Sequence, residues 1–178
     1  MTARVGFGFD IHRVVAGRRL VLGGVAVPCA QGLLGHSDAD VVVHAVASAL
    51  LGAIGAGDLG EHFPDTDPRW RGADSRTLVE AVMRRVAFQR YGVGNVDVTV
   101  LAEQPRLTPF KPRMRAVIAR LLRAPVEVVN VKASTSEGVG PVGRGEAVSA
   151  YAVVLVTRHP HHRQRAARGA LPPGAGSL

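Results

Sequence analysis

Hydrophobic and polar positions along residues 1–157 follow two different periods, which indicates a chain built from both strands and helices. The clearest strand signal lies at 95–103, where every second residue from 96 to 100 is a valine and the residues between are polar. A pair of glycines divides the β-rich segment 19–27 into two short strands or a bent hairpin. The final strand is long and apolar, as central strands are. Strands are expected at 4–9, 19–27, 95–103, 126–135 and 146–158.

Three longer segments have apolar residues at helical spacing and residues that start and stop helices at their ends. They cover residues 38–57, 74–92 and 108–122. Oxygen-bearing side chains are available to cap each N-terminus, and Pro109 suits the first turn of the third helix. The expected N-caps are Ser37 or Asp38, then Asp74 and Thr108, and the expected ends are Gly55 or Gly57 for the first helix and Gly92 for the second.

The order of these elements predicts a single mixed β-sheet covered by about three helices, an α/β fold of the α+β sandwich kind. A length of 178 residues fits one domain, which we place at 1–157. The remaining segment, 158–178, is basic and rich in proline, glycine and alanine, so we expect a disordered tail. Its "HPHH" motif resembles a metal-binding tract, although the composition favours a solvated tail.

Cysteine content and hydropathy point to a soluble cytoplasmic protein. Cys29 is the single cysteine and has no internal disulfide partner, which is typical of a reducing compartment. We expect it to be a buried or half-buried apolar side chain. The N-terminus has no signal-peptide pattern, and the apolar stretch 41–56 is too short and too polar to span a bilayer. No membrane association is therefore expected.

The formal net charge of +8 is unevenly distributed. The segment 158–178 contributes four arginines and no acid, so 18 basic and 14 acidic residues remain in 1–157. No nucleic-acid-binding motif accompanies this charge, and nucleic acid is not expected as a partner. A modestly basic body fits a protein whose ligand is an anion.

The segment "GFGFDIH" places Asp10 and His12 two residues apart on one strand, so both side chains leave the same face. With His44 from "GHSDADVVVHA" they would make a three-ligand site with an open position, the pattern of catalytic zinc. The alternative is that Asp10 is a turn residue and His44 a hydrogen-bonded core histidine; spacing alone leaves both open. The glycines of this segment are expected to let the backbone pass close to a substrate.

Two loops carry further polar chemistry. Residues 57–68, "GDLGEHFPDTDP", hold four carboxylates and are expected to be irregular, either as a solvated turn or in contact with a metal or sugar hydroxyls. Residues 132–146 combine hydroxyl side chains with glycines and Arg144, which suits phosphate oxygens. Glu137 lies among those hydroxyls and is a suitable oxygen ligand for Mg²⁺.

Taken together, these segments resemble the 2-C-methyl-D-erythritol 2,4-cyclodiphosphate synthase family of the non-mevalonate isoprenoid pathway. The matching motifs include "GFDIHR", "GLLGHSDADVVVHA", "GDLGEHFPDTDP", "GNVDVTVLAEQPRL" and "NVKASTSEGVG", in family order from Arg4 to about Thr157. The resemblance implies conversion of 4-diphosphocytidyl-2-C-methyl-D-erythritol 2-phosphate to the cyclic diphosphate. In this reaction the 2-phosphate attacks the β-phosphorus in a two-metal site and CMP leaves, the chemistry of a phosphorus–oxygen lyase. It also implies a homotrimer with active sites between subunits.

The resemblance further assigns roles to individual residues. Zinc would be held by Asp10, His12 and His44, and a second ion, Mg²⁺ or Mn²⁺, by Glu137. His36 and Thr135 would stabilise the transition state. Substrate contacts are implied at Ser37, Asp58, Leu59, Gly60, Phe63, Pro64, Asp65, Thr66, Asp67, Ala102, Glu103, Gln104, Pro105, Arg106, Leu107, Thr108, Lys132, Ala133, Ser134 and Ser136.

The resemblance also implies a cavity on the three-fold axis that takes an isoprenoid diphosphate, bordered by Pro141 and Arg144. Pro141 departs from the aromatic residue of some members, which puts the apolar lining of that cavity in doubt. Ser48 replaces an aspartate that some members carry on the helix of His44. A second hypothesis follows, in which a regulatory trimer senses isoprenoid diphosphates through Arg144.

Overall fold

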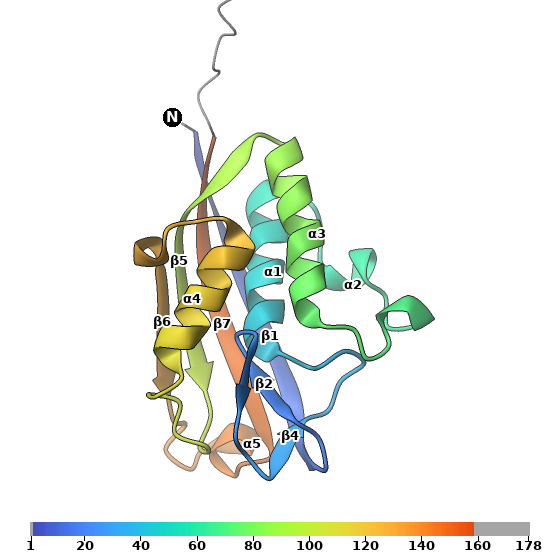
Figure 1. Cartoon of the computed structure of the whole chain (residues 1–178), viewed down its shortest axis with the longest axis vertical. Coiled ribbons are helices and arrows are strands. Elements are labelled where there is room, and N and C mark those ends of the chain that lie inside the picture. Colours follow the sequence, from blue (N-terminus) through green and yellow to red (C-terminus); the bar gives the residue numbers. More distant parts are fainter. Residues whose placement is uncertain (1, 159–178) are drawn as a thin grey trace, which may run out of the picture.

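The computed structural model describes residues 2–158, which form a five-stranded mixed sheet with helices on one face (Figure 1). The strand order is β4-β1-β7-β5-β6, in which β5 and β6 are parallel and the other neighbours are antiparallel. The long apolar β7 is central, as predicted. The strands are β1 (Ala3–Ala16), β4 (Gln31–Leu33), β5 (Tyr91–Leu101), β6 (Val129–Ser134) and β7 (Ala147–Arg158).

Three long helices cover the sheet, which confirms the α/β class. They are α1 (Val41–Ile54), α3 (Ser75–Phe88) and α4 (Lys111–Leu122). Helix α1 packs on β1 and β7, α4 packs on β6, and α3 packs on α1 (Figure 1). A separate hairpin pairs β2 (Leu20–Leu22) with β3 (Val25–Val27), so the single predicted sheet is accompanied by a second, two-stranded one. Within 2–158, no helix is long and apolar enough to cross a membrane.

The face of β1 that meets α1 has glycine at two positions, and the structure gives these glycines of "GFGFDIH" a role different from the predicted one. A Cβ at Gly6 would lie 1.8 Å from the carbonyl oxygen of Ala49, and one at Gly8 would lie 2.0 Å from that of Ala45. The glycines therefore let the helix backbone rest directly on the strand. The prediction that they make room for substrate is wrong, because the space above them is filled by α1.

Helix α1 begins later than predicted, with Asp40 as its N-cap instead of Ser37 or Asp38. The buried Asp40 carboxylate accepts hydrogen bonds from the N–H groups of Val42 and Val43. It also accepts from Gly23 and Gly24, which form the turn of the β2–β3 hairpin. Burial raises the pKa of Asp40 to about 6, against the opposing effect of these N–H groups. The predicted end at Gly55 is confirmed.

Several other boundaries differ from the sequence prediction. Helix α3 has its expected N-cap, Asp74, but it ends at Phe88 with Gln89 as its C-cap, and Gly92 lies in β5. Helix α4 begins at Lys111 after Phe110, so Thr108 is not its cap. The segment 57–68, expected to be irregular, contains α2 (Leu59–His62), and a 3₁₀ turn at Pro68–Trp70 begins at its last residue. Two further short elements are the 3₁₀ turn Val126–Val128, where a strand was expected, and α5 (Gly140–Gly143).

Two further predictions concern Cys29 and the C-terminal tail. Cys29 is exposed, so the expectation of a buried or half-buried thiol is wrong. It lies in the connection between β3 and β4. The predicted tail begins at Arg158, which the structure places at the end of β7, and the rest of it, 159–178, lies outside the described residues.

Candidate metal site and ligand pocket

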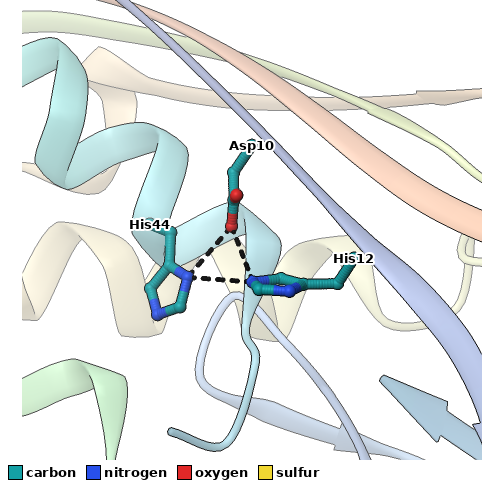
Figure 2. A group of neighbouring side chains, drawn as sticks. All are labelled: Asp10, His12 and His44. Carbon is teal, nitrogen blue, oxygen red and sulfur yellow. Dashed lines mark hydrogen bonds and ion pairs between the residues drawn. The ribbon is translucent and has the colours of Figure 1, made fainter. Parts of the chain in front are cut away.

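Three side chains from two elements converge above the sheet (Figure 2). Asp10 and His12 project from β1 on the helix side, as their two-residue spacing predicted, and His44 projects from α1. Asp10 Oδ2 lies 3.0 Å from His12 Nε2 and 2.9 Å from His44 Nδ1. The two imidazole nitrogens are 3.3 Å apart. The close approach of α1 to β1 brings residues 34 positions apart into one cluster.

This geometry fits a divalent metal ion. Zinc bonds to imidazole nitrogen and carboxylate oxygen at about 2.0–2.1 Å, which puts tetrahedral donor atoms about 3.3 Å apart. The three observed separations, 2.9 to 3.3 Å, match that edge length. All three side chains are partly exposed, so a fourth coordination position would face solvent. The alternative, in which Asp10 is a turn residue, is wrong, because Asp10 lies within β1.

Asp10 and His44 shift the pKa of each other strongly. Burial by itself would raise the pKa of Asp10, but hydrogen bonds to His12 and His44 outweigh it and hold this pKa far below its usual value. Burial alone would lower the pKa of His44, yet the hydrogen bond and charge of Asp10, followed by the charges of Asp40 and Asp38, raise it above 6.5. A metal ion would have to displace the proton from His44, so its affinity falls as the pH falls.

The second ring nitrogen of His44 contacts residues that the sequence analysis did not connect with the site. Nε2 lies 2.7 Å from the hydroxyl of Ser75, the first residue of α3. Ser75 is completely buried and donates its own proton to the Asp38 carboxylate. Ser37, expected among the substrate contacts, lies 3.2 Å from His44 Nε2. The one sequence signal for Ser75 was its place beside the helix cap Asp74.

A pocket of about 310 Å³ lies where β5 and β6 end. It is lined by nine residues that the family resemblance assigned to the ligand: Ala102, Glu103, Pro105, Arg106, Leu107, Thr108, Ala133, Ser134 and Thr135. One of these lining residues, Glu103, accepts a hydrogen bond from Ser136 N. At its edge the Thr135 hydroxyl donates to Glu137 Oε1 over 2.6 Å, and Glu137 has a positive φ of 51°. A non-glycine residue in that conformation is uncommon.

The pocket and the metal cluster lie far apart within one chain. Asp10 is paired with Ala150 in β7, Ala150 with Val100 in β5, and Val100 with Ala133 in β6. Three strand spacings therefore separate Asp10 from Ala133, the pocket residue on β6, about 14 Å. The chain does not bring Glu137 and Thr135 to the cluster.

Other candidate residues already have partners within the chain. Lys132 Nζ is 2.5 Å from Asp97 Oδ2 on the sheet face away from the helices. Arg144 donates to both carboxylate oxygens of Glu146. It also lines a second cavity of about 330 Å³, together with Cys29 and Val148.

The carboxylate loop has local roles. Asp58 caps α2 by accepting from Glu61 N, and Asp67 accepts three hydrogen bonds from the guanidinium of Arg69. Phe63 packs edge-on against Trp70, with ring centroids 5.0 Å apart. His36 is exposed at the start of the loop that leads to α1, and its carbonyl accepts from Gly72 N. These contacts order the loop beside α1 without filling the metal cluster.

An α/β fold with a clustered Asp-His-His set and a separate pocket at its strand ends defines a candidate metal-dependent enzyme. Comparison with known proteins assigns the family, since residues 3–157 match the model of the YgbB family. The chain belongs to the YgbB family.

Curated relatives and solved structures agree with this assignment. A 2-C-methyl-D-erythritol 2,4-cyclodiphosphate synthase of Geobacter metallireducens is 56% identical over 155 residues, 87% of this chain and 99% of that protein. A solved synthase of the same name with bound CDP superposes with a TM-score of 0.80 at 38% identity, covering 86% of this chain and all of that one. The bifunctional IspDF of Campylobacter jejuni superposes with a TM-score of 0.86 at 37% identity, covering 89% of this chain and 43% of that one. The resemblance deduced from the motifs is confirmed.

Proposed function

We propose that this chain converts 4-diphosphocytidyl-2-C-methyl-D-erythritol 2-phosphate into 2-C-methyl-D-erythritol 2,4-cyclodiphosphate and CMP, as a phosphorus–oxygen lyase. The observation that carries the proposal is the convergence of Asp10, His12 and His44 at distances suited to a metal ion. The relatives that bear the synthase name cover almost the whole described chain. One of those solved synthases holds CDP, which supports a ligand with a cytidine diphosphate group.

The residues present suit a reaction that depends on positioning and charge neutralisation. Asp10, His12 and His44 would hold zinc, and Glu137 would hold Mg²⁺ or Mn²⁺; when bound, such ions polarise phosphate oxygens. The nucleophile is the 2-phosphate of the substrate, so the protein needs no serine, cysteine or lysine nucleophile. A phosphate oxygen forms a bond to the β-phosphorus while the bond from that phosphorus to the CMP oxygen breaks. The protein contributes by holding the two groups in contact.

Further roles follow on the same proposal. His36 and the Thr135 hydroxyl donate hydrogen bonds to phosphate oxygens as charge moves towards the leaving CMP. The pocket at the ends of β5 and β6, which is lined in part by the Ala102–Thr108 segment, takes the cytidine group. The carboxylates of the loop 58–67 accept hydrogen bonds from the hydroxyls of the polyol.

We also propose a homotrimer with each active site between two subunits. The sheet face away from the helices exposes six large apolar side chains in one continuous group: Val5, Phe7, Phe9, Ile11, Tyr151 and Val153. Phe9 and Tyr151 contact each other across adjacent strands with tilted rings, whose centroids are 5.0 Å apart. A patch of this kind is characteristic of a protein interface. Within one chain Asp10 and the pocket residue Ala133 lie three strand spacings, about 14 Å, apart, which supports a site completed by the pocket of a neighbouring subunit.

An enzyme assay tests the proposed reaction. The purified protein is incubated with Zn²⁺, Mg²⁺ and the cytidylated 2-phosphate substrate, and the reaction is monitored by phosphorus NMR. We expect one CMP to be released for each cyclic diphosphate formed. Glu137→Gln removes one oxygen ligand for the second ion and is expected to lower the rate about 100-fold. Glu127→Gln, a matched change in the 3₁₀ turn before β6, should retain the wild-type rate. Failure of the wild-type protein to release CMP would disprove the proposed reaction.

The oligomer is tested on the open sheet face. Tyr151→Arg adds a charge to the apolar group, and we expect sedimentation to change from trimer to monomer with loss of CMP release. Phe88→Arg is the control, because Phe88 is 90% exposed on α3, away from the open face. A wild-type protein that sediments as a monomer at assay concentration rejects the trimer, as does a Tyr151→Arg variant that remains trimeric.

A further inference from the structure

We propose that Ser75 and Asp38 are positioning residues that determine which nitrogen of His44 faces the metal. The proposal rests on the metal site of the proposed function and adds two residues that bind neither metal nor substrate. Ser75 opens α3, and Asp38 lies in the loop before α1, 37 positions away. Ser75 contacts Nε2 of His44, the ring nitrogen opposite to the one that faces Asp10, and Asp38 acts through Ser75. Figure 2 shows His44 with its Nδ1 turned towards Asp10 and His12.

Counting protons gives a single direction for this hydrogen-bond chain. A carboxylate only accepts, so the one hydroxyl proton of Ser75 goes to Asp38 Oδ1. The Ser75 oxygen then has only lone pairs to offer to His44 Nε2, 2.7 Å away, and Nε2 must carry the proton. A neutral imidazole protonated at Nε2 has its lone pair on Nδ1. That is the atom that faces Asp10 and His12.

The remaining contacts agree with this direction. Ser37 Oγ lies 3.2 Å from Ser75 Oγ and accepts from Ala39 N, so its proton is free to point at the second lone pair of Ser75. Asp38 Oδ2 accepts from Ser75 N, which holds the carboxylate against the start of α3. Every proton in the chain therefore points away from the metal side of His44.

The backbone holds these partners in place. Asp38 N donates to the carbonyl of Ala73, and Gly72 N donates to that of His36. Residues 36–38 and 72–75 are thus joined at two points beside the ring. Ser75 is completely buried, so water does not compete for its hydroxyl. A neutral ring held in this tautomer presents the lone pair of Nδ1 to the metal, and such outer partners typically change metal affinity by 10- to 100-fold.

The test measures zinc affinity by competition with a chromophoric chelator, on full-length protein at pH 7.5. Ser75→Ala is expected to weaken zinc binding by about 10- to 100-fold. Thr77→Ala is the matched control, since this second hydroxyl of the same helical turn donates to the carbonyl of Asp74. It should bind zinc as the wild type does.

Asp38→Asn is the second variant. The amide oxygen takes over the bond from Ser75 N, and its NH₂ group then faces the Ser75 hydroxyl. The hydroxyl proton turns to His44 Nε2 and favours the wrong tautomer, so zinc binding should weaken similarly. Because both residues act through one chain, the double variant should lose little more than either single one. Additive losses would contradict the chain.

Nitrogen-15 NMR of histidine-labelled, zinc-loaded protein gives a readout that general destabilisation would not move. The wild type should show His44 bound through Nδ1 with a proton on Nε2. The proposal is overturned if Ser75→Ala and Asp38→Asn both bind zinc like the wild type, or if Nε2 of the wild type is unprotonated or bound to zinc. If the wild type binds no zinc at all, the proposed metal site fails first, which separates the two ideas.

Discussion

Replacing His44 by alanine is expected to remove stoichiometric zinc and to lower CMP release by about 1,000-fold or more. The remaining donors, Asp10 and His12, lie on one strand and offer two ligands, too few for a tight site. Without the ion, charge that develops on phosphate oxygens would be left largely to hydroxyl and backbone donors. Zinc content is measured by elemental analysis after dialysis, and CMP release by the same assay as for the wild type.

The control for this experiment is His62→Ala. His62 lies on α2 and is bonded through Nε2 to the carbonyl of Ala56, at 2.7 Å, so its loss removes an imidazole without touching the cluster. Its zinc content should equal that of the wild type. A His44→Ala protein that keeps one tightly bound zinc per chain would show that the Asp-His-His cluster is not the metal site.

The second large effect is on stability. Gly8→Ala is expected to destabilise the protein by at least about 3 kcal/mol, measured as the free energy of unfolding in urea. Its Cβ would lie 2.0 Å from the carbonyl oxygen of Ala45 and 2.6 Å from Ala49 N. Both are backbone atoms of α1, so relief requires moving the helix from the sheet. Such a shift would also move His44 away from Asp10, so we expect the zinc affinity to decrease together with the stability.

Gly52→Ala provides a control at the same interface from the other side. Gly52 lies on α1, and a Cβ there would be 3.8 Å from the carbonyl of Phe7, an ordinary contact. Alanine is the better helix former by about 1 kcal/mol, so this variant should be equal to the wild type or more stable. Unfolding must be compared at one protomer concentration, because assembly adds to stability. A Gly8→Ala protein within 1 kcal/mol of the wild type would contradict the close packing.

Local sequence patterns were sufficient to predict those elements whose structure depends on residues close together in the chain. Alternation from Val96 to Val100 predicted which side chains are buried, and the structure confirms all three valines in the core. The cap Asp74 could be predicted because capping here is local: its carboxylate accepts a hydrogen bond from the N–H of Arg76, two positions ahead. Prediction failed at Asp40, because two of the four N–H groups that it binds belong to a hairpin turn 16 and 17 residues earlier.

The same distinction holds for the candidate site. The sequence by itself determined that Asp10 and His12 share a face, because strand geometry repeats every two residues. Its motifs also supplied the family and His44 as the third donor. Only the tertiary structure decided that Gly6 and Gly8 serve the packing of α1 and that Ser75 controls the far side of His44. It also decided that the pocket of one chain lies far from its own metal cluster. Each of these depends on distances between segments far apart in the chain, which local spacing does not encode.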